Sequence, residues 1–440
     1  MSTNTASRHL LGIGFAVLTA CGASTATPDS ASTSTPDTAP SNAIPTTDEV
    51  QYLDFNMGSE GGSCDDSNLG AIDCHVAALA QRIGEVGDGH TRQLGFMLLL
   101  YPWNQPDIEI TTVIAETFRV ALARNVAVHL TIETHYFWEH RPDLWNFFDA
   151  SSAGYDPANV ANVEWSDWNR TPNRMRYLDW GVPQALGTPH MCYLAPRVQS
   201  EVARMAGVIG AAVKAGADQL AAAGHPELFS GITVGSEPSL DNYTSVDTWD
   251  PSLGQLMNQD GAPKVRLGYC SFAQLGYTTA QPPADLAAAA ANVNQRFIES
   301  WASVLVSSGV AKSRLYTHVA ASADGTDILD FTNAPISVAF IDSARPGWTT
   351  YPWAKLQDNF DPLTTALEAH GSPHWGGTES APFDGVHAIP VYDYLRRHYA
   401  AGATVMVMNT GATGGLGDAL HEAVYGVDAM ADYQRFLRGE

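Results

Sequence analysis

Residues 231–240, GITVGSEPSL, run from small and apolar side chains into Ser-Glu-Pro. A buried strand followed at once by an acidic residue would place the Glu237 carboxylate where the strand reaches solvent. Residues 373–382, PHWGGTESAP, have the same form and present Glu379. Whether the two glutamates belong to one site depends on how these two strands are arranged in the fold.

Short apolar runs alternate with longer helical patterns from residue 50 onward. The predicted strands are 50–57, 93–101, 127–134, 231–236, 315–321, 337–342, 374–379 and 403–409. Helical periodicity covers 74–86, 108–123, 195–224, 283–309 and 389–402. Eight strands alternating with helices predict an α/β fold, a (β/α)8 TIM barrel formed by residues 50–440. The alternative is an open doubly wound sheet, but no GxGxxG or P-loop follows an early strand.

The N-terminal residues have the pattern of an export signal. In residues 1–20, Arg8 precedes the apolar run LLGIGFAVLTA, which is too short to span a bilayer. The end of this run, LTAC, resembles a bacterial lipobox, in which Cys21 would be lipidated. A plain secretory signal with a chance cysteine is the alternative. Residues 21–49 are rich in Ser, Thr, Pro, Ala and Asp, which predicts a disordered tether. We therefore expect an exported protein, lipid-anchored to the bacterial cell envelope in the periplasm or at the cell surface.

The charge of the chain limits its partners. The formal net charge is −24, and removal of residues 1–20, which contain one arginine and no acids, makes it −25. A field of this sign disfavours nucleic acid, anionic lipid headgroups and strongly anionic polymers. We expect no nucleic acid partner and membrane contact only through the lipid anchor. An acidic surface kept for solubility explains the charge equally well.

Four cysteines follow Cys21 and lie at loop positions. An even number of such cysteines in an oxidising compartment favours disulfides. We predict the pairs Cys64–Cys74 and Cys192–Cys270. No cysteine or histidine cluster has zinc-site spacing.

The arrangement of the two glutamates matches a family pattern. A Glu after strand four and a Glu ending strand seven resemble the retaining glycoside hydrolases of clan A. The resemblance implies that Glu237 is the acid/base, that Glu379 is the nucleophile, and that no cofactor or metal is needed. Two features depart from the pattern: Ser236 stands where many members have Asn, and the eighth strand offers Asn409 in place of the usual Trp.

Further residues are predicted to line the substrate site. Aromatic faces stack on the apolar face of a sugar ring, so tryptophans in the long loop after strand three suit such a site. The predicted substrate-binding residues are His135, Trp138, Ser236, His318, Asp342, Arg345 and Trp348. A histidine within a strand, such as His318, is otherwise a hydrogen-bonded core residue.

These observations predict a glycoside hydrolase that cleaves O-glycosidic bonds of an oligo- or polysaccharide with two carboxylates and retention of configuration. A lipoprotein that binds carbohydrate without cleaving it is the first alternative. A barrel hydrolase with a metal centre is the second, although His135, Glu139 and His140 do not have HExxH spacing.

Overall fold

A computed structural model describes most of the predicted barrel. The described residues are 44, 48–56, 64, 69–172, 188–238, 240, 248–250, 255–257, 267–320, 335–350, 361–382, 389–408 and 430–440. The predicted signal, Cys21 and most of the predicted tether lie outside these residues, as does Asn409.

The described strands form one eight-stranded parallel sheet in the order β7-β4-β3-β2-β1-β10-β9-β8. Its strands are β1 (Gln51–Asn56), β2 (Arg92–Leu100), β3 (Ala127–Ile132), β4 (Phe229–Val234), β7 (Leu315–Thr317), β8 (Gly347–Thr349), β9 (Trp375–Ser380) and β10 (Ala403–Met408). A separate two-stranded hairpin contains β5 (Thr248–Asp250) and β6 (Gln255–Met257).

The two edge strands of this sheet, β7 and β8, meet and bring the barrel together. Parallel bridges join Tyr316 to Arg345 and Val319 to Trp348. The Thr317 amide donates to the Arg345 carbonyl at 2.9 Å, and the Thr349 amide donates to the Val319 carbonyl at 3.1 Å. The predicted (β/α)8 fold class is therefore confirmed.

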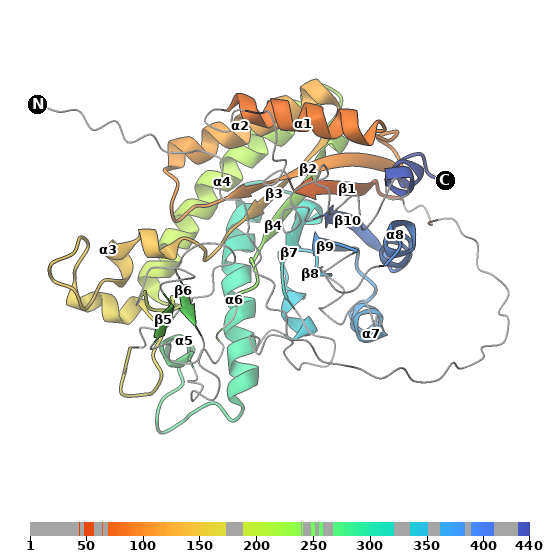
Figure 1. The fold of residues 1–440 in the computed structure, drawn as a ribbon. Coiled ribbons are helices and arrows are strands. Elements are labelled where there is room, and N and C mark those ends of the chain that lie inside the picture. Colours follow the sequence, from red (N-terminus) through yellow and green to blue (C-terminus); the bar gives the residue numbers. More distant parts are fainter. Residues whose placement is uncertain are drawn as a thin grey trace, which may run out of the picture.

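Helices surround the sheet (Figure 1). The long ones are α1 (Gly70–Ile83), α2 (Asp107–Arg124), α4 (Pro196–Ala222), α6 (Leu286–Ser307), α7 (Asp361–Ala369) and α8 (Val391–Ala400). Neighbours along the chain pack together, as α1 does on α2, α2 on α4 and α4 on α6. Short helices α3 (Pro142–Trp145) and α5 (Tyr269–Gln274) lie within the long connections after β3 and β4.

One strand prediction was wrong. Residues 337–342 do not form the sixth strand of the barrel: Ile336–Ala339 is a 3-10 helix. The strand is instead β8, which begins at Gly347. A run of apolar residues fits a buried 3-10 turn as well as a strand, and a three-residue strand is too short to show a period of two.

The core has two parts, because strand side chains alternate between the helices and the barrel interior. The larger part lies between strands and helices. The smaller part fills the interior with Tyr52, Met97, Ala127, Tyr316, Val405 and Val407. Beside it lies a buried polar group in which the Asp54 carboxylate is 3.2 Å from His129 and accepts a hydrogen bond from Ser230 at 2.8 Å.

Both predicted disulfides are confirmed. Cys64 is bonded to Cys74 and Cys192 to Cys270. The second bond ties the connection after β3 to helix α5. Disulfides are typical of proteins outside the cytoplasm. Among the described residues, no helix has the length and apolar character needed to cross a membrane.

The ordered body begins before the predicted tether ends. Ile44 is buried, and its carbonyl accepts a hydrogen bond from the Arg92 guanidinium at 3.2 Å. Glu49 forms an ion pair with Arg345 at 2.7 Å. The end of the predicted segment 21–49 therefore packs against the N-terminal side of the barrel.

The interior polar group leaves no room for a side chain at Gly95 of β2. A Cβ atom built there would lie 1.7 Å from the Asp54 Oδ1 atom. We expect Gly95→Ala to lower the free energy of unfolding by at least about 2 kcal/mol, because the buried carboxylate must shift. Denaturant unfolding followed by circular dichroism measures this change.

Gly207 in α4 provides the matched control, since a Cβ built there meets no heavy atom within 4 Å. Gly207→Ala should leave stability unchanged or raise it by about 0.5–1 kcal/mol. Equal stabilities for Gly95→Ala and the wild type would contradict the tight packing around Asp54.

Candidate active site

Strand β4 ends in an unusual turn that presents Glu237. Three successive residues have positive φ angles: Gly235 at 127°, Ser236 at 46° and Glu237 at 57°. A Cβ at Gly235 would lie 2.8 Å from the His318 carbonyl oxygen, so a glycine is needed there. The Glu237 amide donates to the same carbonyl at 3.2 Å. Two consecutive non-glycine residues in the left-handed region are costly, and such strain is concentrated at functional sites.

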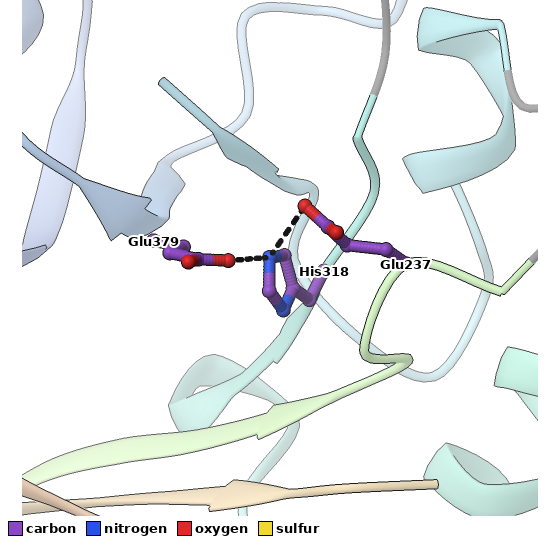
Figure 2. A group of neighbouring side chains, drawn as sticks. All are labelled: Glu237, His318 and Glu379. Carbon is purple, nitrogen blue, oxygen red and sulfur yellow. Dashed lines mark ion pairs between the residues drawn. The ribbon is translucent and has the colours of Figure 1, made fainter. Parts of the chain in front are cut away.

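His318 lies between the two glutamates at the C-terminal end of the barrel (Figure 2). Its Nε2 atom is 3.5 Å from Glu237 Oε1 and 3.2 Å from Glu379 Oε2. One carboxylate oxygen of each glutamate and a ring nitrogen of His318 all lie within 4.8 Å of one another. The two stretches that present Glu237 and Glu379 therefore meet in one cluster.

The two carboxylates control the charge of His318. Burial alone would lower the pKa of the ring, but hydrogen bonds to Glu237 and Glu379 and their negative charges outweigh it and raise the pKa of His318 to about 10. At neutral pH the ring is therefore an imidazolium that neutralises part of the charge of the pair. Exposure of the side chain increases from 8% for His318 to 12% for Glu237 and 26% for Glu379.

Strand β8 supplies another group that the sequence reasoning missed. The Thr349 hydroxyl donates a hydrogen bond to Glu237 Oε1 and lies 2.9 Å from His318 Nε2. Thr349 ends β8, so the misplaced sixth strand hid its position. It fixes the orientation of the Glu237 carboxyl.

Glu133, directly after β3, is a third carboxyl beside this cluster, and the sequence reasoning also missed it. Burial raises the pKa of Glu133 to about 7; the positive charge of His318 and the Ser236 hydroxyl oppose this rise, while Glu379 and Glu237 add to it. The sequence position of Glu133 could have indicated this role, because Glu133 comes after β3 just as Glu237 comes after β4.

Two predicted residues lie next to the cluster but are turned into the protein. The Ser236 hydroxyl donates to the Ile132 carbonyl at 2.8 Å and so faces strand β3. His135 is buried, and its ring stacks on Tyr136 at 4.7 Å. Burial and the charges of His190 and His318 hold the pKa of His135 well below its usual range, so this ring is neutral.

The two predicted tryptophans are core residues, which corrects the expectation that they line the site. Trp138 is fully buried, and its indole nitrogen donates to the Pro189 carbonyl at 3.0 Å. Trp348 is fully buried in β8, where its ring lies 5.7 Å from that of Trp375. Neither ring has a face available for a sugar.

Asp342 and Arg345 are also placed away from the carboxylates. Both precede β8 instead of following it, so they lie toward the N-terminal side of the barrel. Asp342 is exposed, and the Arg345 guanidinium binds the Glu49 carboxylate. Their predicted role followed from the wrong strand at 337–342.

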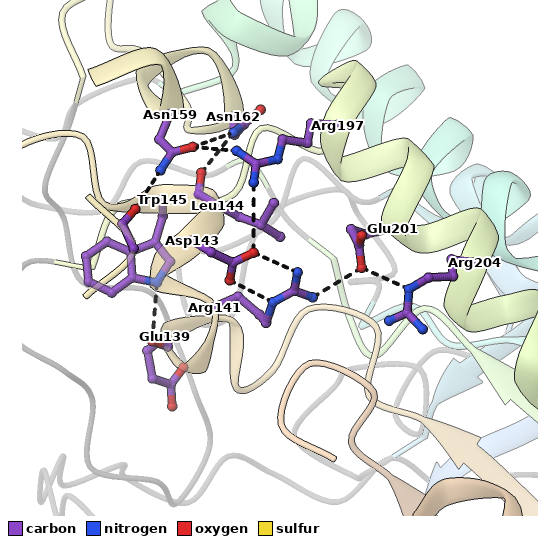
Figure 3. A network of polar contacts seen from close by, with 11 residues as sticks. Glu139, Arg141, Asp143, Leu144, Trp145, Asn159, Asn162, Arg197, Glu201 and Arg204 are labelled. Atoms are coloured by element: carbon purple, nitrogen blue, oxygen red, sulfur yellow. Dashed lines mark hydrogen bonds and ion pairs between the residues drawn. The ribbon is translucent and has the colours of Figure 1, made fainter. Parts of the chain in front are cut away.

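The long loop after β3 is held against helix α4 by charged groups (Figure 3). The Arg141 guanidinium donates two hydrogen bonds of 2.9 Å to Asp143 and a third of 3.3 Å to Glu201. Glu201 also accepts from Arg204 at 3.1 Å, and the Trp145 indole donates to the Glu139 carbonyl at 3.2 Å. This network fixes residues 139–145 of the loop against α4.

One imidazole and two carboxylates also form a donor set of the kind that binds divalent metal ions. A metal ion would have to displace the proton from His318 Nε2, because an imidazolium has no lone pair to offer. The charge state of this histidine therefore distinguishes acid–base chemistry from metal binding.

No family model matches this chain, and no curated protein does either. Solved structures that it resembles include the catalytic domain of β-amylase from Paenibacillus polymyxa, at 10% identity and a TM-score of 0.46, covering 87% of this chain and 98% of that one. An exo-β-1,4-mannosidase from Opitutaceae bacterium strain TAV5 is 11% identical with a TM-score of 0.44, covering 91% and 62%. A broad-specificity endoglucanase from an uncultured bacterium is 9% identical with a TM-score of 0.41, covering 88% and 97%.

The raised pKa of His318 predicts a pH-dependent stability. Because the folded value of about 10 exceeds the unfolded value of about 6.5, protonation of His318 stabilises the fold fully below pH 6.5 and loses this effect as the pH rises through 10. The difference in unfolding free energy between the wild type and His318→Gln should therefore shrink from pH 6.5 to pH 10. A difference that stays constant over this range would contradict the imidazolium.

Proposed function

We propose that this protein is a glycoside hydrolase that cleaves O-glycosidic bonds with retention of configuration. The observation that carries the proposal is the pairing of Glu237 and Glu379, with one oxygen of each within 4.8 Å at the C-terminal end of the barrel. Retaining enzymes hold their carboxyl groups about 5–5.5 Å apart, and inverting enzymes about 6.5–9.5 Å apart. The close approach of one oxygen from each carboxyl supports the shorter spacing, that of a retaining enzyme.

With substrate bound, Glu237 takes up a proton and Glu379 stays ionised; in the first step a Glu379 oxygen then attacks the anomeric carbon while the Glu237 carboxyl gives that proton to the leaving oxygen. The C–O bond to the leaving group breaks, and an ester between the sugar and Glu379 forms. In the second step, Glu237 takes a proton from water, and the water oxygen attacks the anomeric carbon. The bond to Glu379 then breaks, and both carboxyls return to their starting states.

The environment of the pair suits this division of work. His318 lies nearer to Glu379, at 3.2 Å, than to Glu237, at 3.5 Å, and its positive charge keeps the nucleophile ionised and stabilises it as a leaving group in the second step. Glu237 is the less exposed of the two and accepts the Thr349 hydroxyl, which directs its carboxyl. No step needs a cofactor.

We further propose that the substrate is an oligo- or polysaccharide met outside the cytoplasm. The predicted signal, Cys21 as the lipid anchor and the disulfides support this location. The net charge of −25 after removal of the signal favours neutral over strongly anionic glycans.

Hydrolysis of a panel of 4-nitrophenyl α- and β-glycosides and of neutral polysaccharides tests the proposal. We expect Glu379→Gln to abolish turnover and Glu237→Gln to lower kcat about 10²–10⁴-fold. With 2,4-dinitrophenyl glycosides, whose leaving group needs no proton, the first turnover of Glu237→Gln should be nearly as fast as that of the wild type. Steady-state kinetics and the initial burst of dinitrophenol measure both effects.

Glu227→Gln is the matched control, because Glu227 lies at the other end of β4, before the strand begins. This variant should keep wild-type activity. An active Glu379→Gln protein with an intact fold would overturn the assignment. Binding of glycans without turnover by the wild type would select the carbohydrate-binding alternative.

The second candidate is a metal-dependent hydrolase, which the arrangement of Glu237, His318 and Glu379 as a donor set favours. Dialysis against EDTA separates the two candidates. The two-carboxylate mechanism predicts unchanged kcat after chelation, whereas loss of activity restored by a divalent metal ion would establish the metal centre.

A further inference from the structure

We propose that Glu133 is a third active-site carboxyl that binds the substrate directly, by accepting a hydrogen bond from a hydroxyl group of the sugar held between Glu237 and Glu379. This inference rests on the proposed function and names one contact within the same site.

The direction of the Glu133 side chain follows from strand β3. Val128, Leu130 and Ile132 pack in the core between strands and helices, while Ala127 belongs to the interior cluster. His129, also on the inner face, contacts Asp54 and Thr233 inside the barrel. The Glu133 amide continues the strand by donating to the Leu100 carbonyl at 2.9 Å. Glu133 therefore extends the inward series 127, 129, 131 to the mouth of the barrel.

The backbone holds Glu133 directly beside the turn that presents Glu237. The Ser236 hydroxyl donates to the carbonyl of Ile132, the residue before Glu133, at 2.8 Å. The amide of Thr134, the residue after Glu133, donates to the same hydroxyl at 3.4 Å. The Thr134 hydroxyl donates to the Gly235 carbonyl at 2.7 Å. The ends of β3 and β4 are thus bonded on both sides of Glu133. Its carboxyl interacts electrostatically with Glu237, Glu379 and His318.

These contacts also give Ser236, a predicted substrate-binding residue, a structural role. Its hydroxyl proton is directed to the Ile132 carbonyl, so its role is to join two strands. At the end of β3, Glu133 lies on the inner face and carries a carboxyl acceptor. A sugar hydroxyl at this place would meet that carboxyl.

A second buried carboxyl, Glu164, shows what a purely structural glutamate looks like here. One oxygen of Glu164 accepts from the Ser271 hydroxyl, and the other accepts from the Cys270 amide at 3.2 Å. Both oxygens are thus matched by protein donors. At Glu133 the effect of burial is opposed by His318, which Glu237 and Glu379 also share, and by the Ser236 hydroxyl. A buried carboxyl is stabilised further when a ligand provides additional hydrogen-bond donors.

The test compares Glu133→Ala, Glu133→Gln and the wild type on a 4-nitrophenyl glycoside that the wild type cleaves and on its monodeoxy analogues. We expect Glu133→Ala to lower kcat/KM about 10–100-fold on the parent glycoside, because the bound hydroxyl loses its acceptor. On the one analogue that lacks this hydroxyl, the two proteins should agree within about threefold. Glu133→Gln keeps a carbonyl acceptor and should lose less than Glu133→Ala.

Glu164→Gln is the matched control for altering a buried carboxyl, and its activity should equal that of the wild type. Equal activity of Glu133→Ala and the wild type on the parent glycoside would overturn the proposal. A loss of the same size on every analogue would also overturn it, since it would reflect a general disturbance of the site.

Failure of the proposed function gives a different result. If the wild type cleaves none of the glycosides, the same set is tested by calorimetric binding. Weaker binding by Glu133→Ala that disappears on one deoxy analogue would still support the contact with a sugar hydroxyl. Equal affinities, or a wild type that binds none of the glycosides, would overturn it.

Discussion

The junction between β7 and β8 determines both the shape of the barrel and the geometry of its site. These strands have three residues each, and they join the two edges of the sheet through two bridges and a few backbone hydrogen bonds. The same junction supplies His318 and Thr349, the two groups that contact Glu237. If the edges separated, the carboxyl of Glu237 would lose its partners. The contacts that close the barrel therefore also position the carboxyl of Glu237.

Most of the fold could be predicted from the sequence, because parallel strands buried on both faces are continuous apolar runs of five or more residues. Seven of the eight strands overlap a predicted strand, although β9, WGGTES, is not such a run. The exception is β8, Gly347–Thr349. Its three residues are too few to show the alternation of a strand, and pairing with the adjacent strands holds them in the sheet. The run 337–342 has the composition of a strand, but its first part folds as a 3-10 helix.

The two glutamates of the site could be predicted from the sequence, but the residues around them could be predicted less well. Glu237 follows β4 and Glu379 lies near the end of β9, so the parallel topology brings both to one end of the barrel. Trp138 and Trp348 were ambiguous, because an aromatic side chain serves a core as well as a sugar site, and burial decides between the two. Arg345 was misplaced with its strand. The roles of Glu133 and Thr349 depend on which way a strand residue points, which follows from the register of the sheet.

In the proposed mechanism, Glu379 forms a covalent bond with the sugar. Incubation with a 2-deoxy-2-fluoro glycoside bearing a good leaving group slows the second step and traps the ester, which peptide mass spectrometry then locates. The two-carboxylate account predicts one added fluorosugar per chain, on the peptide that contains Glu379. A label on Glu237 or Glu133, or an active enzyme in which no peptide is labelled, would contradict it.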